Sequence, residues 1–131
     1  EVYCKIETKG LNPYFGFMHR DAEKHPTLAS DLMEEWRAVI VDATVMSIIN
    51  GNEIQKDDFV KNIDEPGCYL NRTGVGILIK KLEKKFQTDV KYLDYVEYPV
   101  NFRHAMMLQV NQLVKAIENE DASIYHPIQI R

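Results

Sequence analysis

Residues 27–50 read TLASDLMEEWRAVIVDATVMSIIN, and Gly51 follows directly. At about 100° per residue on a helix, five of these side chains fall within one sector that should face a core: Leu32, Trp36, Ile40, Ala43 and Ser47. The acidic side chains fall on roughly the opposite side, where we expect solvent: Asp31, Glu34, Glu35 and Asp42. The pattern therefore predicts a long amphipathic helix from about Leu28 to Asn50, capped by Thr27 and closed by Gly51.

Three further helices are predicted on either side of this one. The stretch before Gly10 has the pattern of the last turns of a helix with a glycine stop. Thr73 is expected to cap a helix whose core stripe is Val75, Ile79, Leu82 and Phe86. Pro99 suits the first residue of another helix, with the core stripe Phe102, Met106, Val110, Leu113 and Ile117.

The segment between the second and third predicted helices contains turn signals. Lys56–Lys61 could form a helical turn that carries Phe59, and Pro66-Gly67 is a turn pair. We therefore expect a mostly α fold: a helical domain of four to six helices with one small β-hairpin near residues 62–72.

Composition limits the function. The chain has 131 residues, of which 45% are hydrophobic and 27% charged, which fits one compact domain with a real core. A net charge of −4 excludes a globally basic nucleic-acid-binding protein, although it allows a local basic patch. No apolar run approaches the roughly 20 residues of a membrane span, and two cysteines, Cys4 and Cys68, are too few for a disulfide scaffold.

One group of residues has the chemistry of a metal site. Asp31 and Glu34 are one turn apart on the predicted helix, and His19 ends the connector that precedes it. A mixed imidazole and carboxylate ligand set suits Mn²⁺, or Mg²⁺ with retained waters. Acidic residues are also common in the first turns of helices because of the helix dipole, so spacing alone favours a solvated acidic face over a metal site.

A second group is basic. Lysines lie on the helix expected after Thr73: Lys80, Lys81, Lys84 and Lys85. Such a face could contact phosphates without reading bases. The alternative is a solvated helix surface with Glu83 interspersed, and the pattern by itself favours that alternative.

Residues 10–42, GLNPYFGFMHRDAEKHPTLASDLMEEWRAVIVD, carry a specific resemblance. The matches to a known family, in order and spacing, are the Gly10-Leu11-Asn12-Pro13 turn, the Gly16-Phe17-Met18-His19 segment, the helical stretch Thr27–Arg37 and the pair Val41-Asp42. The chain resembles the C-terminal helical domain of the CRISPR adaptation endonuclease family, the integrase subunit of spacer acquisition. A looser similarity extends over Asp58-Phe59, Phe102-Arg103, Gln109, Tyr125 and Pro127.

The resemblance implies a divalent-metal-dependent DNA nuclease and integrase. His19 and Glu34 match metal ligands of the family, for Mg²⁺ or Mn²⁺, and Asp31 matches an acidic residue near the metal. Residues 1–131 would then be a C-terminal helical catalytic domain fragment, without the N-terminal β-rich domain or the helix that bears the first metal ligand, a glutamate. We therefore expect this fragment alone to be weakly active or inactive.

The resemblance also implies partners. The family acts on double-stranded DNA, joining a protospacer to the repeat array, as a homodimer with a small ferredoxin-like adaptation subunit. Residues that could position phosphates are Arg20, Arg37, Lys80, Lys81, Lys84 and Lys85. We expect no membrane association and a cytoplasmic location in a prokaryote. The alternative function is a non-catalytic helical interaction module or a DNA-binding module.

Overall fold

The structure, a computed structural model, describes residues 1–20, 24–61 and 66–130. These residues are mostly helical, as predicted, with five α-helical segments and two short antiparallel strand pairs. Within this part of the chain no helix is both long and apolar enough to cross a bilayer. The chain divides into two compact units, one formed by Glu1–Arg37 with Gln87–Arg131 and the other by Ala38–Phe86.

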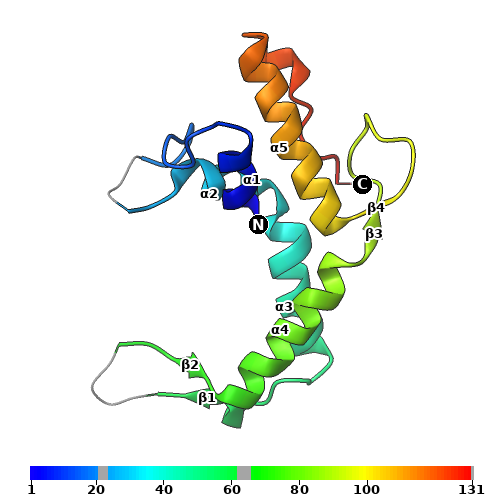
Figure 1. The fold of residues 1–131 in the computed structure, drawn as a ribbon. Coiled ribbons are helices and arrows are strands. Elements are labelled where there is room, and N and C mark those ends of the chain that lie inside the picture. The colour runs from blue at the N-terminus through cyan, green and yellow to red at the C-terminus, as the bar shows by residue number, and fades with distance from the viewer. Residues whose placement is uncertain (21–23, 62–65, 131) are drawn as a thin grey trace. The chain divides into compact units, whose positions relative to one another are not determined.

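Three helices form the core of the first unit (Figure 1): α1 (Val2–Thr8), α2 (Thr27–Arg37) and α5 (Phe102–Glu118). Trp36 of α2 is 2% exposed, and its ring meets that of Phe102 edge to face, with 6.0 Å between the centroids. Aromatic pairs in this geometry stabilise a core beyond the apolar area they bury. The Trp36–Phe102 contact therefore fixes α2 against α5.

The ends of the helices in this unit follow local rules. Gly10 has φ +80°, the left-handed conformation expected just after the end of α1. Helix α5 is capped by Asn101, whose Oδ1 accepts a hydrogen bond of 2.8 Å from the amide of His104, so the prediction that Pro99 begins the helix is wrong. Most of the predicted α5 stripe is buried, but Ile117 is 41% exposed.

A strand pair in the first unit was not predicted. Strand β3 (Asp89–Val90) pairs antiparallel with β4 (Val100–Asn101) just before α5. Two-residue strands are too short to show the alternation of polar and apolar residues that identifies a strand in sequence.

The predicted long helix contains a π-helical segment, Ala38–Asp42, between α2 and α3 (Ala43–Asn50). A π turn bonds residue i to i+5, so it holds one residue more than an α turn. Each later residue therefore takes the angular position that the residue before it would have in an uninterrupted α-helix. The buried residues of α3 are accordingly Thr44 and Ile48, not the predicted Ala43 and Ser47.

The second unit pairs α3 with α4 (Arg72–Phe86), beside a small hairpin in which β1 (Phe59–Val60) pairs with β2 (Tyr69–Leu70) (Figure 1). The hairpin was predicted, but its first strand begins before residue 62. Phe59 lies in this strand rather than in the preceding 3₁₀ turn, Lys56–Asp58. Residues 62–65, which the prediction placed in the hairpin, lie outside the described residues, as do residues 21–23.

Two predictions about α4 are wrong. The cap is Asn71, whose Oδ1 accepts a 2.8 Å hydrogen bond from the amide of Gly74, and not Thr73. Val75 and Ile79 of the predicted core stripe are 39% and 55% exposed. The only fully buried residue of α4 is Gly74, which brings the helix close to its neighbours.

The phase shift after the π-helical segment predicts which residues of α3 stabilise the protein. We expect Ile48→Ala to lower the free energy of unfolding by about 2–4 kcal/mol, because it opens a cavity at a side chain that is 2% exposed. Ser47→Ala, on the face that uninterrupted α-helical periodicity would bury, should change it by less than about 0.5 kcal/mol. Urea unfolding of both variants checks this, and a larger effect at Ser47 would contradict the shift.

Candidate functional site

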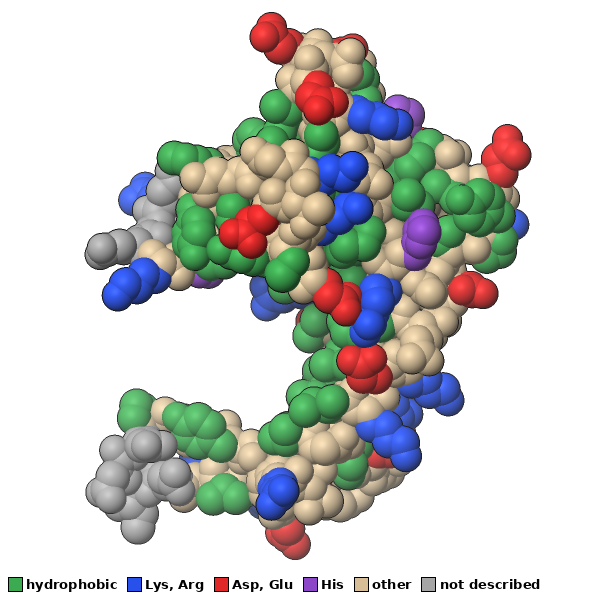
Figure 2. All heavy atoms as spheres, viewed as in Figure 1, with side chains coloured by type: hydrophobic (Ala, Val, Ile, Leu, Met, Phe, Trp, Pro, Cys, Tyr) green, Lys and Arg blue, Asp and Glu red, His purple; other side chains and the backbone are tan. Residues whose placement is uncertain are grey.

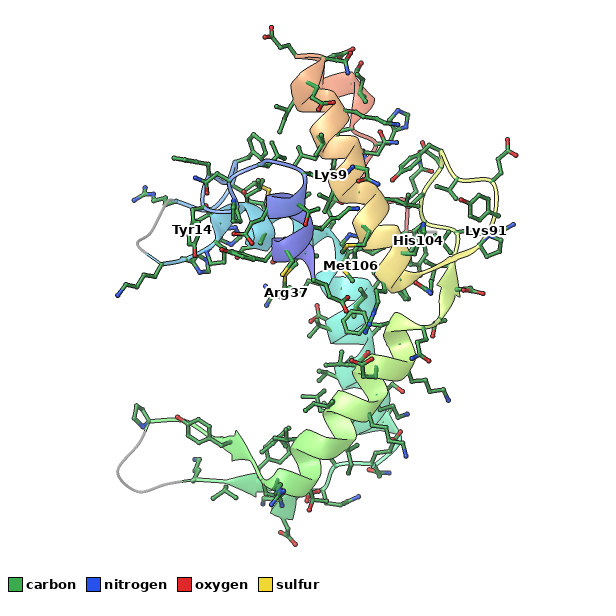
Figure 3. All side chains as sticks on the ribbon, viewed as in Figure 1. Lys9, Tyr14, Arg37, Lys91, His104 and Met106 are labelled. Carbon is green, nitrogen blue, oxygen red and sulfur yellow. The ribbon has the colours of Figure 1, made fainter. Side chains whose placement is uncertain are left out.

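The connector between α1 and α2 folds back onto the start of α2. The Thr27 hydroxyl donates to the carbonyl of Tyr14 (2.7 Å) and accepts from the amide of Gly16 (2.9 Å), and the amide of Leu28 donates to the carbonyl of Pro13 (2.9 Å). Tyr14 is labelled beside this helix in Figure 3. Because these bonds use backbone groups, the connector follows a fixed path at the end of α2.

Gly16 allows this close approach. A Cβ at that position would lie 2.6 Å from Oδ2 of Asp31 and 2.8 Å from Cβ of Thr27, both well inside van der Waals contact. Only a residue without a side chain fits between the connector and α2. The glycine of the Gly-Phe-Met-His segment is therefore explained by packing.

The carboxylate of Asp31 binds the end of the connector. Its oxygens accept hydrogen bonds from three consecutive amides, those of Phe17 (2.5 Å), Met18 (2.9 Å) and His19 (3.1 Å). Oδ1 also lies 2.5 Å from Nδ1 of the His19 ring. One carboxylate therefore holds both the backbone and the imidazole of His19.

The environment of Asp31 corrects the prediction that all acidic residues of this helix face solvent. The Asp31 side chain is 7% exposed. Burial raises the pKa of this carboxyl, but the hydrogen bonds from Met18, the His19 ring, Phe17 and the His19 amide outweigh burial and lower its pKa to about 2. Asp31 is therefore a buried anion at neutral pH, stabilised by the connector.

The side chains of His19 and Glu34, unlike that of Asp31, are accessible to solvent. The side chains of His19 and Glu34 are each 42% exposed. Residues three apart are neighbours on a helix, so Asp31, which binds the His19 ring, and Glu34 lie one turn apart on α2. Glu34 Oε1 accepts a 3.0 Å bond from Arg37 Nη1, an exposed pair of the kind that contributes little to stability and can open.

His19 and Glu34 have the donor types that a hard divalent cation takes. A metal-ligating histidine generally donates its second ring nitrogen to a carboxylate, and Nδ1 of His19 is committed to Asp31 in this way. Imidazole and carboxylate donors suit Mn²⁺ or Mg²⁺. Among the described residues, no group of three His, Cys, Asp or Glu side chains is placed to hold a metal ion.

The residues predicted to contact phosphates are divided between the two units. Arg20 is exposed at the end of the connector, and Arg37 ends α2 (Figure 3). The four lysines lie on α4 in the second unit, where Lys81 pairs with Glu53 at 2.6 Å while Lys80 and Lys84 are exposed. Figure 2 shows lysine and arginine side chains spaced along α4. The basic face on α4 is thus present, and Lys81 is among its paired members.

The remaining histidines have local roles. The His25 ring lies 6.3 Å from the His19 ring between centroids, and Nδ1 of His126 is 3.1 Å from both carboxylate oxygens of Asp94. His104 is exposed on α5, apart from Tyr14 and the connector (Figure 3).

Sequence reasoning missed a polar cluster around Glu35, one turn after Asp31 on α2. Gln109, 1% exposed, bonds to Tyr95, to Glu35 and to the carbonyl of His126, and Tyr125 also bonds to Glu35. Glu35 is half-buried, which corrects its predicted place in solvent. Gln109 itself could have indicated this cluster from the sequence, because a polar residue within a buried helical stripe must find hydrogen-bond partners.

Comparison with known proteins identifies relatives of this arrangement. A family model described as CRISPR associated protein Cas1 matches residues 1–84. The CRISPR-associated endonuclease Cas1 of Mycobacterium tuberculosis (strain CDC 1551 / Oshkosh) is 35% identical over 113 residues, which cover 86% of this chain and 33% of that protein. The chain therefore spans about a third of the length of this relative.

Solved structures share the fold. A casposase bound to integration product superposes with a TM-score of 0.82 at 23% identity, over 98% of this chain and 35% of that one. A chain of a Cas6-RT-Cas1–Cas2 complex superposes with a TM-score of 0.77 at 24% identity, over 96% of this chain and 13% of that one.

The low pKa of Asp31 predicts how stability depends on pH. Its folded pKa of about 2 is below the ordinary 3.8, so its contribution should be complete above about pH 5 and lost as the pH falls towards 2. At pH 7 we expect Asp31→Asn to lower the free energy of unfolding by about 1–3 kcal/mol, because the amide cannot accept all of the hydrogen bonds. Urea unfolding between pH 2 and 7 should show this difference shrinking in acid. The exposed Asp42→Asn is the control, and a difference that stays constant with pH would contradict the assignment.

Proposed function

The chain belongs to the Cas1 family of CRISPR-associated proteins, and from this membership we propose that the protein is a divalent-metal-dependent DNA endonuclease and integrase of spacer acquisition. Because the chain spans about a third of the Mycobacterium relative, the activity proposed is that of the full-length protein. His19 and Glu34 are proposed as two of its metal ligands, for Mg²⁺ or Mn²⁺.

The observation that carries the proposal is the bond between His19 Nδ1 and the buried Asp31 carboxylate. It fixes the ring orientation and makes Nε2 the nitrogen that can face a cation. A solvated acidic face would not need a buried carboxylate with hydrogen bonds from three backbone amides and an imidazole. Asp31 is thus proposed as the residue that positions His19, and Glu34 as the acidic ligand.

The proposed reaction is phosphoryl transfer. The 3′-hydroxyl of a captured DNA fragment attacks a phosphodiester of the repeat array and displaces a DNA 3′-oxygen, whereas in nuclease action water attacks instead. A bound divalent cation supplies positive charge that stabilises the phosphoryl group during the displacement. This chain contributes the ligands His19 and Glu34, and Arg37, once its exposed pair with Glu34 opens, is free to contact a phosphate.

DNA is the proposed macromolecular ligand, held through its phosphates. The exposed lysines of α4 and the exposed Arg20 suit such contacts, which need no base recognition and depend strongly on salt. The casposase that shares this fold was solved with its integration product, which supports the proposal.

We also propose that the full-length protein works as a homodimer with a small ferredoxin-like adaptation subunit. One of the structures that share the fold is part of a Cas1–Cas2 complex, which supports a protein partner of this kind.

Metal binding tests the proposed ligands. In the full-length protein, His19→Ala and Glu34→Gln should each weaken Mn²⁺ binding at least about tenfold, because each removes one donor. Electron paramagnetic resonance of free Mn²⁺ during a titration measures this without DNA. Strand transfer with labelled DNA should fall in both variants.

The matched control is His104→Ala, an exposed histidine away from the connector. It should leave Mn²⁺ affinity unchanged. Mn²⁺ binding indifferent to both ligand substitutions would favour the alternative, a non-catalytic interaction or DNA-binding module.

DNA binding tests the lysine face of α4. The double variant Lys80→Ala with Lys84→Ala should weaken binding of the full-length protein to duplex DNA and reduce the slope of log K against log salt by about 2, roughly one unit for each lost phosphate contact. The control is Lys91→Ala with Lys115→Ala, two exposed lysines of the first unit. Equal effects of the two pairs would exclude a specific role for α4.

A further inference from the structure

A buried polar network joins α2, α5, the loop after β3 and the C-terminal tail. Its centre is the side-chain amide of Gln109, which is 1% exposed. Nε2 donates to Oε2 of Glu35 and to the carbonyl of His126, both at 3.0 Å, and Oε1 accepts from the Tyr95 hydroxyl at 2.7 Å. The nitrogen and the oxygen of this amide therefore both have hydrogen-bond partners inside the protein.

The carboxylate of Glu35 is the end of the network on α2. Its Oε2 accepts from Gln109 and from the Tyr125 hydroxyl, each at 3.0 Å. Burial, together with the negative charge of Glu35, raises the pKa of Tyr125 and of Tyr95 above the ordinary phenol value. Both phenols are therefore protonated at neutral pH and donate their hydrogen bonds.

Two acidic side chains thus anchor α2 on separate partners. Asp31 binds the connector, and Glu35, one turn later, binds the tail and α5. Glu34 lies between them in sequence and has only the exposed pair with Arg37 among the described residues. Since residues on a rigid helix turn together, the bonds to Asp31 and Glu35 fix the direction of the Cα–Cβ bond of Glu34.

We propose that Gln109 and Tyr125 are positioning residues that act through Glu35 to hold Glu34 in the geometry that binds the metal together with His19. This inference rests on the proposed function, because it assumes that Glu34 is a ligand. The anchoring of α2 is a separate claim, which can be measured in the metal-free protein. Small displacements of a ligand matter because metal sites need their donors held closely in place.

The test uses two substitutions in the full-length protein. Tyr125→Phe keeps the ring and removes the hydroxyl that donates to Glu35, and Gln109→Met keeps the approximate shape and removes the central amide. Each should weaken Mn²⁺ binding about tenfold and speed amide hydrogen exchange across residues 31–37 of the metal-free protein by a similar factor. Tyr125→Phe alone decides the matter if Gln109→Met does not fold.

Two controls separate positioning from general loss of stability. Tyr92→Phe is the same chemical change on a half-buried ring of the same unit that packs on Phe102 and lies outside the network. Ile48→Val removes one methyl from the core of the second unit and lowers stability without touching the network. Both should bind Mn²⁺ as the parent protein does.

The outcomes distinguish the two levels of the proposal. The positioning proposal is wrong if Tyr125→Phe has the same Mn²⁺ affinity and the same amide hydrogen exchange as the control Tyr92→Phe. The metal site stands in that case if His19→Ala loses Mn²⁺ binding. If His19→Ala also binds Mn²⁺ normally, the proposed metal site is wrong and the positioning proposal fails with it. Faster exchange at residues 31–37 with weaker Mn²⁺ binding only in the network variants would support the proposal.

Discussion

The bond set around the Asp31 carboxylate is the constraint on which the candidate site depends. A buried carboxylate is tolerated only when hydrogen bonds replace its hydration, and here three backbone amides and one imidazole do so. The same bonds give the connector its path and His19 its orientation. Fold and site therefore share one interaction, and Gly16 is the steric condition that lets the connector come close enough to make it.

The acidic residues of α2 have different roles although they are close in sequence. Asp31 and Glu35 are held by other parts of the first unit, whereas Glu34 keeps an exposed carboxylate. A helix held at two acidic side chains one turn apart can present a third acid at low entropic cost, because the backbone is already ordered. This explains how an acid-rich helix can be both a structural centre of its unit and the proposed source of a metal ligand.

The sequence predicted the helical class, the buried Leu32 and Trp36 of α2 and half of the buried residues of α5, and the resemblance identified the family. Helical periodicity could not predict the later part of the long helix, because the π-helical segment adds a residue to one turn. Helical periodicity also placed Asp31 and Glu35 in solvent. It could not do otherwise, because their partners come from segments distant in sequence: His19 for Asp31 and Tyr125 for Glu35. The β3–β4 pair was missed because two-residue strands carry no pattern.

The π-helical segment has a consequence for how this protein should be aligned with others. If a homologue lacked one residue between Ala38 and Asp42, the helix would close into regular α turns, and each subsequent side chain would keep the direction it has here. Its equivalent of Ile48 would then be the residue one position earlier by simple counting. When such a homologue is aligned with this chain, the gap should be placed between Ala38 and Asp42. An alignment with the gap in the loop after Asn50 would pair buried with exposed residues throughout α3.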